Sequence, residues 1–217
     1  MPSQHGSVSR IIRSSVGAAA AQVPRRDRRS FLYPLVPRHA VGVEIGVWKE
    51  DFSEQLMRHG APRLLHLVDP WEFVTRPGYE DALYGGKVAK TQTDMDAIYR
   101  GVLVRFSAQL ACGRVVVHRG KSSEIAGQLE DESLDWAYID GDHTYDAVRL
   151  DVSAWWPMVR SGGLLMGDDY GRPPLPLRPF ATTWWDDGVT RAVDEFVAGE
   201  HLAPVALSKG QFVLRKP

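Results

Sequence analysis

The chain has 217 residues, of which 44% are apolar and 24% are charged, and these values fit one α/β domain of ordinary size. Its 26 Lys and Arg residues nearly balance its 27 Asp and Glu residues, so no strong net field attracts nucleic acid or an anionic lipid surface. The single Cys, Cys112, excludes an intrachain disulfide, and no apolar run approaches the roughly 18 residues that would predict a membrane span. We therefore expect a cytoplasmic protein with neither a nucleic-acid partner nor a membrane partner.

The first 30 residues differ in charge from the rest of the chain, because they contain six Arg and one Asp. Few acids and a run of Ala are also typical of targeting peptides, but Arg13 and Ser14 interrupt the apolar stretch and no convincing cleavage site follows. We expect residues 1–38 to form a basic N-terminal extension that packs on the surface or on a second subunit, which leaves a homo-oligomer open. Residues 39–217 are expected to form one domain.

From residue 40 onward, short apolar runs alternate with helical patterns, which is typical of strands joined by crossover helices in a parallel sheet. The expected strands are 41–46, 63–69, 114–120, 134–141 and 163–169. The expected helices are 52–60, 94–110, 122–129, 143–159 and 189–198, with Gly162 and Gly163 closing the fourth of them. A final hairpin joins residues 204–208 to residues 211–215.

Two connecting segments are too long for simple turns. Residues 171–188 contain four Pro and two adjacent Trp, and residues 71–90 join the second strand to the helix expected over 94–110. We predict that both segments form lids that exclude water and select the substrate.

Acidic residues mark the ends of the expected strands. In an open α/β sheet, ligands bind outside the carboxyl ends of the strands, near the point where strand order reverses. Four of the five strands carry a carboxylate there: Glu44, Asp69, Asp140 and the pair Asp168 and Asp169. This edge is therefore the expected ligand site.

The turn after the first strand contains Gly46, which permits close approach of the backbone to a ligand, and the next helix offers free N–H groups. One Gly does not make a GxGxxG fingerprint, which argues against a nicotinamide dehydrogenase. Asp69 follows Glu44 by 25 residues, about where a Rossmann-type fold places the acid that accepts ribose hydroxyls. The alternative for Asp69 is a turn cap before Pro70.

Asp140, Asp168 and Asp169 would share one rim if the fourth and fifth strands are neighbours, since adjacent strands lie about 5 Å apart. Carboxylates that close need raised pKa values or a cation between them. A hard divalent ion such as Mg²⁺, which prefers oxygen ligands, would satisfy them. The alternative is that these acids are solvated helix caps.

His143 follows Asp140 by three residues at the start of a helix. A neutral imidazole there could take a proton from a substrate hydroxyl, although an isolated surface His is more often inert. The other His residues lack metal-ligand spacing, and no GxSxG motif is present, so neither a structural zinc site nor a nucleophile elbow is expected.

The sequence between residues 40 and 170 resembles the class I S-adenosylmethionine-dependent methyltransferases. The resemblance rests on VEIGVW at 43–48, LVDPW at 67–71, HRGKSSE at 118–124, YIDGDHTYDAVRLDVSAWWPMVRSGG at 138–163 and LLMGDDY at 164–170. Within that superfamily the chain is similar to small metal-dependent O-methyltransferases of the catechol and macrocin types. The resemblance implies a Rossmann-like α/β fold, with a mainly parallel seven-stranded sheet, a C-terminal antiparallel hairpin and helices on both faces.

The resemblance also implies roles for individual residues. The S-adenosylmethionine site would comprise Glu44, Gly46, Ser53, Asp69 and Ser122, and the metal, most simply Mg²⁺, would be held by Asp140, Asp168 and Asp169. His143 and Asp140 would be catalytic, with His143 where the catechol enzymes carry a lysine base. Glu50 departs from the family pattern, because Gly usually holds that position, and a carboxylate there would repel the carboxylate of the donor.

The expected function is therefore metal-assisted transfer of a methyl group from S-adenosylmethionine to a hydroxyl of a sugar or other small secondary metabolite. A bound metal would lower the pKa of the hydroxyl, and a base would receive its proton. Two alternatives remain: a metal-independent methyltransferase acting on nitrogen or a carboxylate, and a binding protein that retains the fold without turnover.

Overall fold

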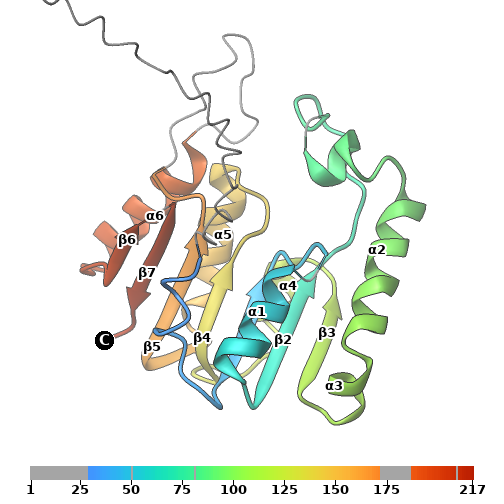
Figure 1. Cartoon of the computed structure of the whole chain (residues 1–217). Coiled ribbons are helices and arrows are strands. Elements are labelled where there is room, and N and C mark those ends of the chain that lie inside the picture. The colour runs from blue at the N-terminus through green and yellow to red at the C-terminus, as the bar shows by residue number, and fades with distance from the viewer. Residues whose placement is uncertain (1–28, 50, 81, 172–186, 209) are drawn as a thin grey trace, which may run out of the picture.

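The computed structural model describes residues 29–217 except residues 50, 81, 172–186 and 209. Its centre is a seven-stranded sheet of order β3-β2-β1-β4-β5-β7-β6 (Figure 1). The parallel strands are β1 (Val41–Ile45), β2 (Leu64–Asp69), β3 (Val115–Arg119), β4 (Leu134–Ile139) and β5 (Val159–Asp168). β6 (Ala206–Ser208) and β7 (Gln211–Arg215) form the antiparallel hairpin, and β7 pairs with β5. The predicted fold class is confirmed.

Helices cover both faces of the sheet because alternate strand residues point to opposite sides. Apolar residues of α4 (Ser122–Ala126), α5 (Tyr145–Trp155) and α6 (Gly188–Gly199) pack on the face that contains Val43 and Ile45. Those of α1 (Asp51–Gly60), α2 (Gln92–Arg105) and α3 (Ser107–Ala111) pack on the face that contains Leu65 and Leu67. The sheet is therefore buried on both sides, and its free surface for ligands is its edge.

The helix expected over 143–159 is shorter than predicted. α5 ends at Trp155, because Pro157 has no N–H for a continuing helix, and β5 already begins at Val159. Gly162 and Gly163 therefore lie inside a strand and do not close a helix. Gly162 has a φ of +74°, and the pairing of β4 with β5 shifts register nearby. This irregular start of β5 carries the Gly pair.

The helix expected over 94–110 is divided into α2 and α3. The break lies at Phe106, whose φ of −98° and ψ of 16° leave the helical region. Phe106 is buried, so its ring still contributes to the continuous apolar face that the sequence pattern predicted.

The described part of the N-terminal extension packs on its own domain. Leu32 and Val36 are buried in the core on the α1 face of the sheet. Backbone hydrogen bonds from Leu32 N to Arg29 O (2.9 Å) and from Val36 N to Leu32 O (3.1 Å) form a compact turn. Arg29 is thereby held three residues from a fully buried anchor. The extension before residue 29 lies outside the described residues.

Of the two expected lids, residues 71–90 are described except for residue 81. This segment rises above the carboxyl edge of the sheet between β2 and α2 (Figure 1) and contains a short irregular helical turn, Leu83–Lys87. The other expected lid falls mostly on residues 172–186, outside the described residues. Within the described ranges, every helix is too short or too polar to cross a bilayer.

Candidate functional site

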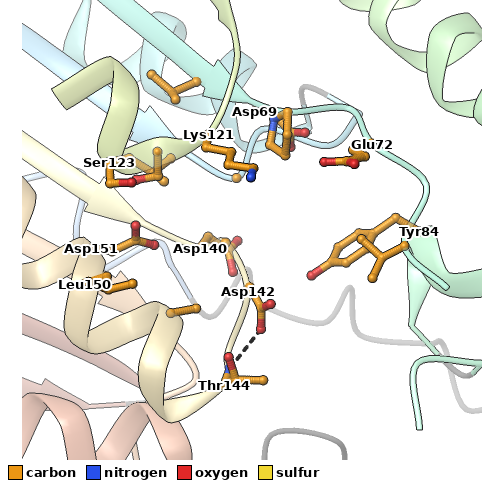
Figure 2. A pocket seen from close by; sticks show the side chains of 18 of the residues that line it. Asp69, Glu72, Tyr84, Lys121, Ser123, Asp140, Asp142, Thr144, Leu150 and Asp151 are labelled. Atoms are coloured by element: carbon orange, nitrogen blue, oxygen red, sulfur yellow. Dashed lines mark hydrogen bonds between the residues drawn. The ribbon is translucent and has the colours of Figure 1, made fainter. Parts of the chain in front are cut away.

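The main pocket lies where strand order reverses, since β1 pairs with β2 on one side and with β4 on the other. Its volume is about 430 Å³, within the range of roughly 300–1,000 Å³ that small-molecule sites occupy. Figure 2 shows Asp69 and Lys121 on one side and Asp140 and Asp142 on the other, with Tyr84 pointing into the opening. Of the predicted site residues, those that line it are Gly46, Asp69, Ser122 and Asp140.

Gly46 forms the tight turn at the end of β1. Its φ is +88°, and a Cβ atom there would lie 2.1 Å from the backbone oxygen of Asp140. Only glycine fits such a conformation and such a contact. This packing brings the ends of β1 and β4 together, so that the turn and Asp140 border one pocket.

Asp69 ends β2 and accepts hydrogen bonds from the backbone. The N–H of Trp48 donates to its Oδ2 at 3.0 Å and the N–H of Trp71 donates to its Oδ1 at 2.6 Å. Burial raises the pKa of Asp69 to about 6, and these N–H donors oppose part of that rise. Each carboxylate oxygen still has acceptor capacity, so Asp69 can hold a ligand hydroxyl as predicted.

Trp48 and Trp71 adopt left-handed backbone conformations, with φ values of 52° and 42°. Such conformations cost about 1–3 kcal/mol in a residue other than glycine. Their N–H groups are aimed at Asp69, and the indole N–H of Trp71 donates to the carbonyl of Trp48 at 3.0 Å. The loops after β1 and β2 are thus fixed around one carboxylate.

Glu44 and Ser53 lie behind the pocket wall and do not line it. The Ser53 hydroxyl donates to Glu44 Oε2 at 2.5 Å, and both residues are almost inaccessible to solvent. Burial raises the pKa of Glu44 to about 8, which favours its neutral form. The pair supports the turn from within, and a direct contact of either residue with a donor molecule stays a prediction.

The pocket is also lined by Lys121, Ser122 and Asp151. Ser122 Oγ accepts a hydrogen bond from the indole N–H of Trp155 at 2.7 Å. Asp151 lies on the inward face of α5, and burial raises its pKa to about 6. The sequence reasoning missed Asp151, although an acid three residues after the inward-facing Val148 is a signal that could have found it.

The segment 71–90 contributes aromatic and charged groups to the pocket. The Tyr79 hydroxyl donates to Asp142 Oδ2 at 2.9 Å, and Arg76 lies 3.9 Å from the same oxygen. Tyr84 and Glu72 line the opening (Figure 2). These contacts join the segment to the loop after β4, in keeping with the predicted lid position. The individual residues carried no sequence signal.

Asp140, Asp168 and Asp169 do converge at the ends of β4 and β5, but two basic side chains lie among them. Arg29 Nη2 bonds to Asp140 Oδ2 and, at 2.6 Å, to Asp168 Oδ2. His143 Nε2 lies 3.4 Å from Asp140 Oδ1 and its Nδ1 lies 3.2 Å from Asp169 Oδ2. We call these five residues the charge cluster.

His143 was expected to act as a neutral base, and its surroundings favour the protonated form. Burial alone would lower the pKa of His143, but Asp140, Asp169 and Asp168 outweigh burial and raise it. Both ring nitrogens of His143 face carboxylates. Asp140 lines the pocket, whereas His143 does not. His143 therefore lies behind Asp140 as its partner.

The carboxylates of the charge cluster are a poor fit for the expected metal ion. Asp168 is 2% exposed, and its Oδ1 accepts the N–H of Asp169 at 2.6 Å and the side-chain amide of Gln211. Its Oδ2 accepts from Arg29, so a metal ion would have to displace the guanidinium. Across the described part of the chain, no group of three or more His, Cys, Asp or Glu side chains is arranged to hold a metal. The metal site expected at Asp140, Asp168 and Asp169 stays a prediction, which this arrangement does not favour because Arg29 lies between two of its members.

Glu50 falls on one of the undescribed positions, so its effect on a donor carboxylate stays a prediction.

Comparisons with known proteins agree with this geometry. A family model described as a methyltransferase domain matches residues 41–170. A search of curated proteins finds no significant match.

Three solved structures illustrate the likeness in fold. A Staphylococcus aureus protein assigned as a caffeoyl-CoA O-methyltransferase has a TM-score of 0.60 at 12% identity, covering 87% of this chain and 82% of its own. The Burkholderia thailandensis 1,6-didemethyltoxoflavin-N1-methyltransferase, with 1,6-didemethyltoxoflavin and S-adenosylhomocysteine bound, has a TM-score of 0.55 at 16% identity. The match covers 88% of this chain and 77% of that enzyme. Aeropyrum pernix fibrillarin, in complex with S-adenosylmethionine, has a TM-score of 0.52 at 13% identity. The match covers 82% of this chain and 66% of that protein.

Proposed function

The chain belongs to the methyltransferase domain family, and we propose that this S-adenosylmethionine-dependent enzyme methylates a hydroxyl of a small acceptor, such as a sugar or another secondary metabolite. One observation carries the proposal: Asp140 borders the pocket and also belongs to the charge cluster. An acceptor hydroxyl in the pocket would meet a carboxylate whose position is fixed from behind by Arg29 and His143.

The proposed donor half of the pocket runs along the ends of β1, β2 and β3. Asp69 would accept the ribose hydroxyls, Ser122 would lie near adenine, and the turn at Gly46 would admit the methionine part. This placement of the donor is supported because Asp69, Ser122 and Gly46 all line the same pocket. The raised pKa of Glu44 favours its neutral form, which reduces the electrostatic repulsion between Glu44 and the carboxylate of the donor.

The proposed acceptor half lies between Asp140 and the segment 71–90. Asp140 accepts a hydrogen bond from the acceptor hydroxyl and orients its lone pair toward the methyl group. Tyr79 fixes Asp142 beside it, and Tyr84 restricts the opening. Closure of this segment would exclude water from a reactive sulfonium.

The chemistry is a displacement at carbon. S-adenosylmethionine supplies an electrophilic methyl group, and as the new bond to the acceptor oxygen forms, the bond to sulfur breaks and its electron pair stays on sulfur. The hydroxyl proton passes to Asp140 and then to solvent. The products are the methyl ether, neutral S-adenosylhomocysteine and one proton. No metal ion takes part in the proposal, since Arg29 fills the position between Asp140 and Asp168.

The test is a matched acceptor panel. The purified chain is incubated with S-adenosylmethionine labelled in the methyl group and with sets of small molecules that differ only in presenting a hydroxyl, an amine or a carboxylate. We expect S-adenosylhomocysteine and a labelled methyl ether from hydroxyl acceptors, identified by mass spectrometry. Labelled methylamine or methyl ester products from the matched compounds, without any ether, would refute the assignment.

An amine acceptor is the second candidate. Glu72 and Asp142 line the opening of the pocket and would attract a protonated amine. The same panel separates the two candidates, because an N-methyltransferase would label the amine member of each set. Binding of the donor with no product from any member would instead favour a binding protein.

A further inference from the structure

Arg29 makes contacts that fix its guanidinium in the charge cluster. It bonds to Asp140 and Asp168, which follow it in the sequence by 111 and 139 residues. Its Cζ lies 4.5 Å from the centroid of the Phe52 ring and 5.6 Å from that of Tyr138, within the range of cation–π attraction. Arg29 is therefore held by carboxylates and by aromatic rings together.

The backbone also places Arg29 firmly. Leu32 is fully buried and its N–H bonds to the Arg29 carbonyl at 2.9 Å, so the guanidinium extends from an anchored turn. On the other side, Gln211 of β7 donates to Asp168 Oδ1 and accepts the Tyr138 hydroxyl at 2.7 Å. Both partners of the ion pair are thus oriented by buried groups, which limits the entropy lost in forming it.

A divalent ion could not join this arrangement without cost. It would compete with Arg29 for Asp140 Oδ2 and Asp168 Oδ2, and at the other oxygens of the cluster it would lie next to a like charge, whose repulsion is strong in a buried site. A planar guanidinium, in contrast, bridges two carboxylates with separate N–H groups and is always charged. The geometry thus gives the carboxylates a permanent cation from within the chain.

We infer that Arg29 serves as the resident cation of the acceptor site, fixing Asp140 for the reaction in the position that a divalent metal would otherwise take. This inference rests on the proposed function, since it assigns Asp140 the hydroxyl. Arg29 is a positioning residue, because it acts through Asp140 and Asp168. The enzyme accordingly needs no divalent ion for transfer, and removal of the guanidinium creates a vacant carboxylate site that attracts one.

The test measures Mn²⁺ binding to the full chain by electron paramagnetic resonance, which needs no acceptor. Three variants are compared with the unsubstituted chain: Arg29→Gln removes the charge, Arg29→Lys keeps it, and Arg160→Ala is the control. Arg160 pairs with Asp135 at 2.7 Å, and Asp135 also accepts the N–H of Val41 at the start of β1, so the control removes an Arg–Asp pair remote from the carboxyl edge. Circular dichroism and thermal melting establish that each variant is folded.

We expect Arg29→Gln to bind Mn²⁺ at least tenfold more tightly than the unsubstituted chain, while Arg29→Lys and Arg160→Ala match it. Transfer by the unsubstituted chain should persist in excess chelator, and Arg29→Gln should lose at least tenfold in kcat with Arg29→Lys recovering part of it. Tight Mn²⁺ binding by the unsubstituted chain, with chelator abolishing both binding and transfer, would overturn the inference, whether or not Arg29→Gln folds. A folded Arg29→Gln that binds Mn²⁺ no better than Arg160→Ala would also overturn it. A wrong acceptor class would leave the Mn²⁺ results unchanged, so the two proposals fail separately.

Discussion

Asp69 and Asp168 occupy equivalent places, each at the carboxyl end of a parallel strand and each almost buried, yet their partners differ in kind. Asp69 accepts from neutral backbone N–H groups, among them those of Trp48 and Trp71, and Arg119 acts on it electrostatically. Asp168 accepts from Arg29, which is charged, and from Gln211. Neutral donors add no positive charge beside the carboxylate of Asp69, whereas the guanidinium of Arg29 balances part of the negative charge of Asp168. The two halves of the edge are thus prepared differently, one for ligand hydroxyls and one for holding Asp140.

The largest effect is expected at Asp140, in the half of the sheet edge where Arg29 contacts the carboxylates. Asp140→Asn should lower kcat by about 10²–10⁴, the usual contribution of a positioned proton acceptor, while the affinity for S-adenosylmethionine stays within about twofold. Initial rates of S-adenosylhomocysteine formation and calorimetric titration of the donor measure the two. His143→Gln should cause a smaller loss, because His143 acts through Asp140. An Asp140→Asn enzyme with normal kcat and weakened donor binding would reverse the assignment of the halves.

The next largest effect is expected at Asp69, in the half of the sheet edge where backbone N–H groups contact the carboxylate. Asp69→Asn should weaken S-adenosylmethionine binding by about 10–100-fold, since a charge-assisted hydrogen bond contributes about 1.5–3 kcal/mol. Calorimetry measures the Kd. Asp135→Asn is the matched control, because Asp135 also accepts a backbone N–H, that of Val41 at 2.7 Å, but lies at the other end of the sheet. Equal weakening in both variants would attribute the loss to general destabilisation.

A pH series sharpens the same comparison. The pKa of Asp69 is raised by burial to about 6, so the ionised form that accepts ribose hydroxyls becomes predominant above that pH. Raising the pH from 5 to 7 should therefore tighten donor binding up to about tenfold, as expected for one group titrating at this pKa. Asp69→Asn should lose this dependence. A binding profile that is flat in the unsubstituted chain would contradict the role of Asp69.

The last expected effect concerns the stability of the fold and not transfer, and it involves the buried Asp151. Burial raises the folded-state pKa of Asp151 to about 6 from an ordinary value of 3.8, so the folded chain holds a proton that the unfolded chain releases between these values. Its contribution to stability falls as the pH rises through this window and then levels off. Asp151→Asn should therefore be more stable than the unsubstituted chain by up to about 3 kcal/mol at pH 8 and nearly equal to it near pH 4. Urea unfolding at both pH values measures the difference, and equal stability at pH 8 would argue against it.

Much of the fold follows from local sequence patterns. Apolar runs that stop at acids located the parallel strands. Gly46 was expected to let a ligand approach the backbone, and in the structure its missing side chain leaves room for the backbone of Asp140. The break at Phe106 and the early end of α5 were missed. In the second case, the glycine pair after the helix suggested a cap, whereas Pro157 had already ended the helix and the glycines serve an irregular strand.

The pocket was predictable only where its residues follow strands directly. Gly46, Asp69, Ser122 and Asp140 meet because parallel strands end at one edge, which the order of elements implies. Arg29 could not be predicted in this way, since nothing in a basic N-terminal stretch indicates which carboxylate it contacts more than a hundred residues later. Because Arg29 was unknown, three converging acids were interpreted as a metal site.

The contacts of Asp168 have a consequence for how the site is completed. Its two oxygens accept from Arg29, in the N-terminal extension, from Gln211, in β7, and from the N–H of Asp169. A chain truncated before β7 would lose Gln211 as well as the strand itself. The carboxylate of Asp168 would then no longer be oriented toward the guanidinium of Arg29. Competence for transfer should therefore arise late in folding, when the N-terminal extension and β7 have docked on the same side chain.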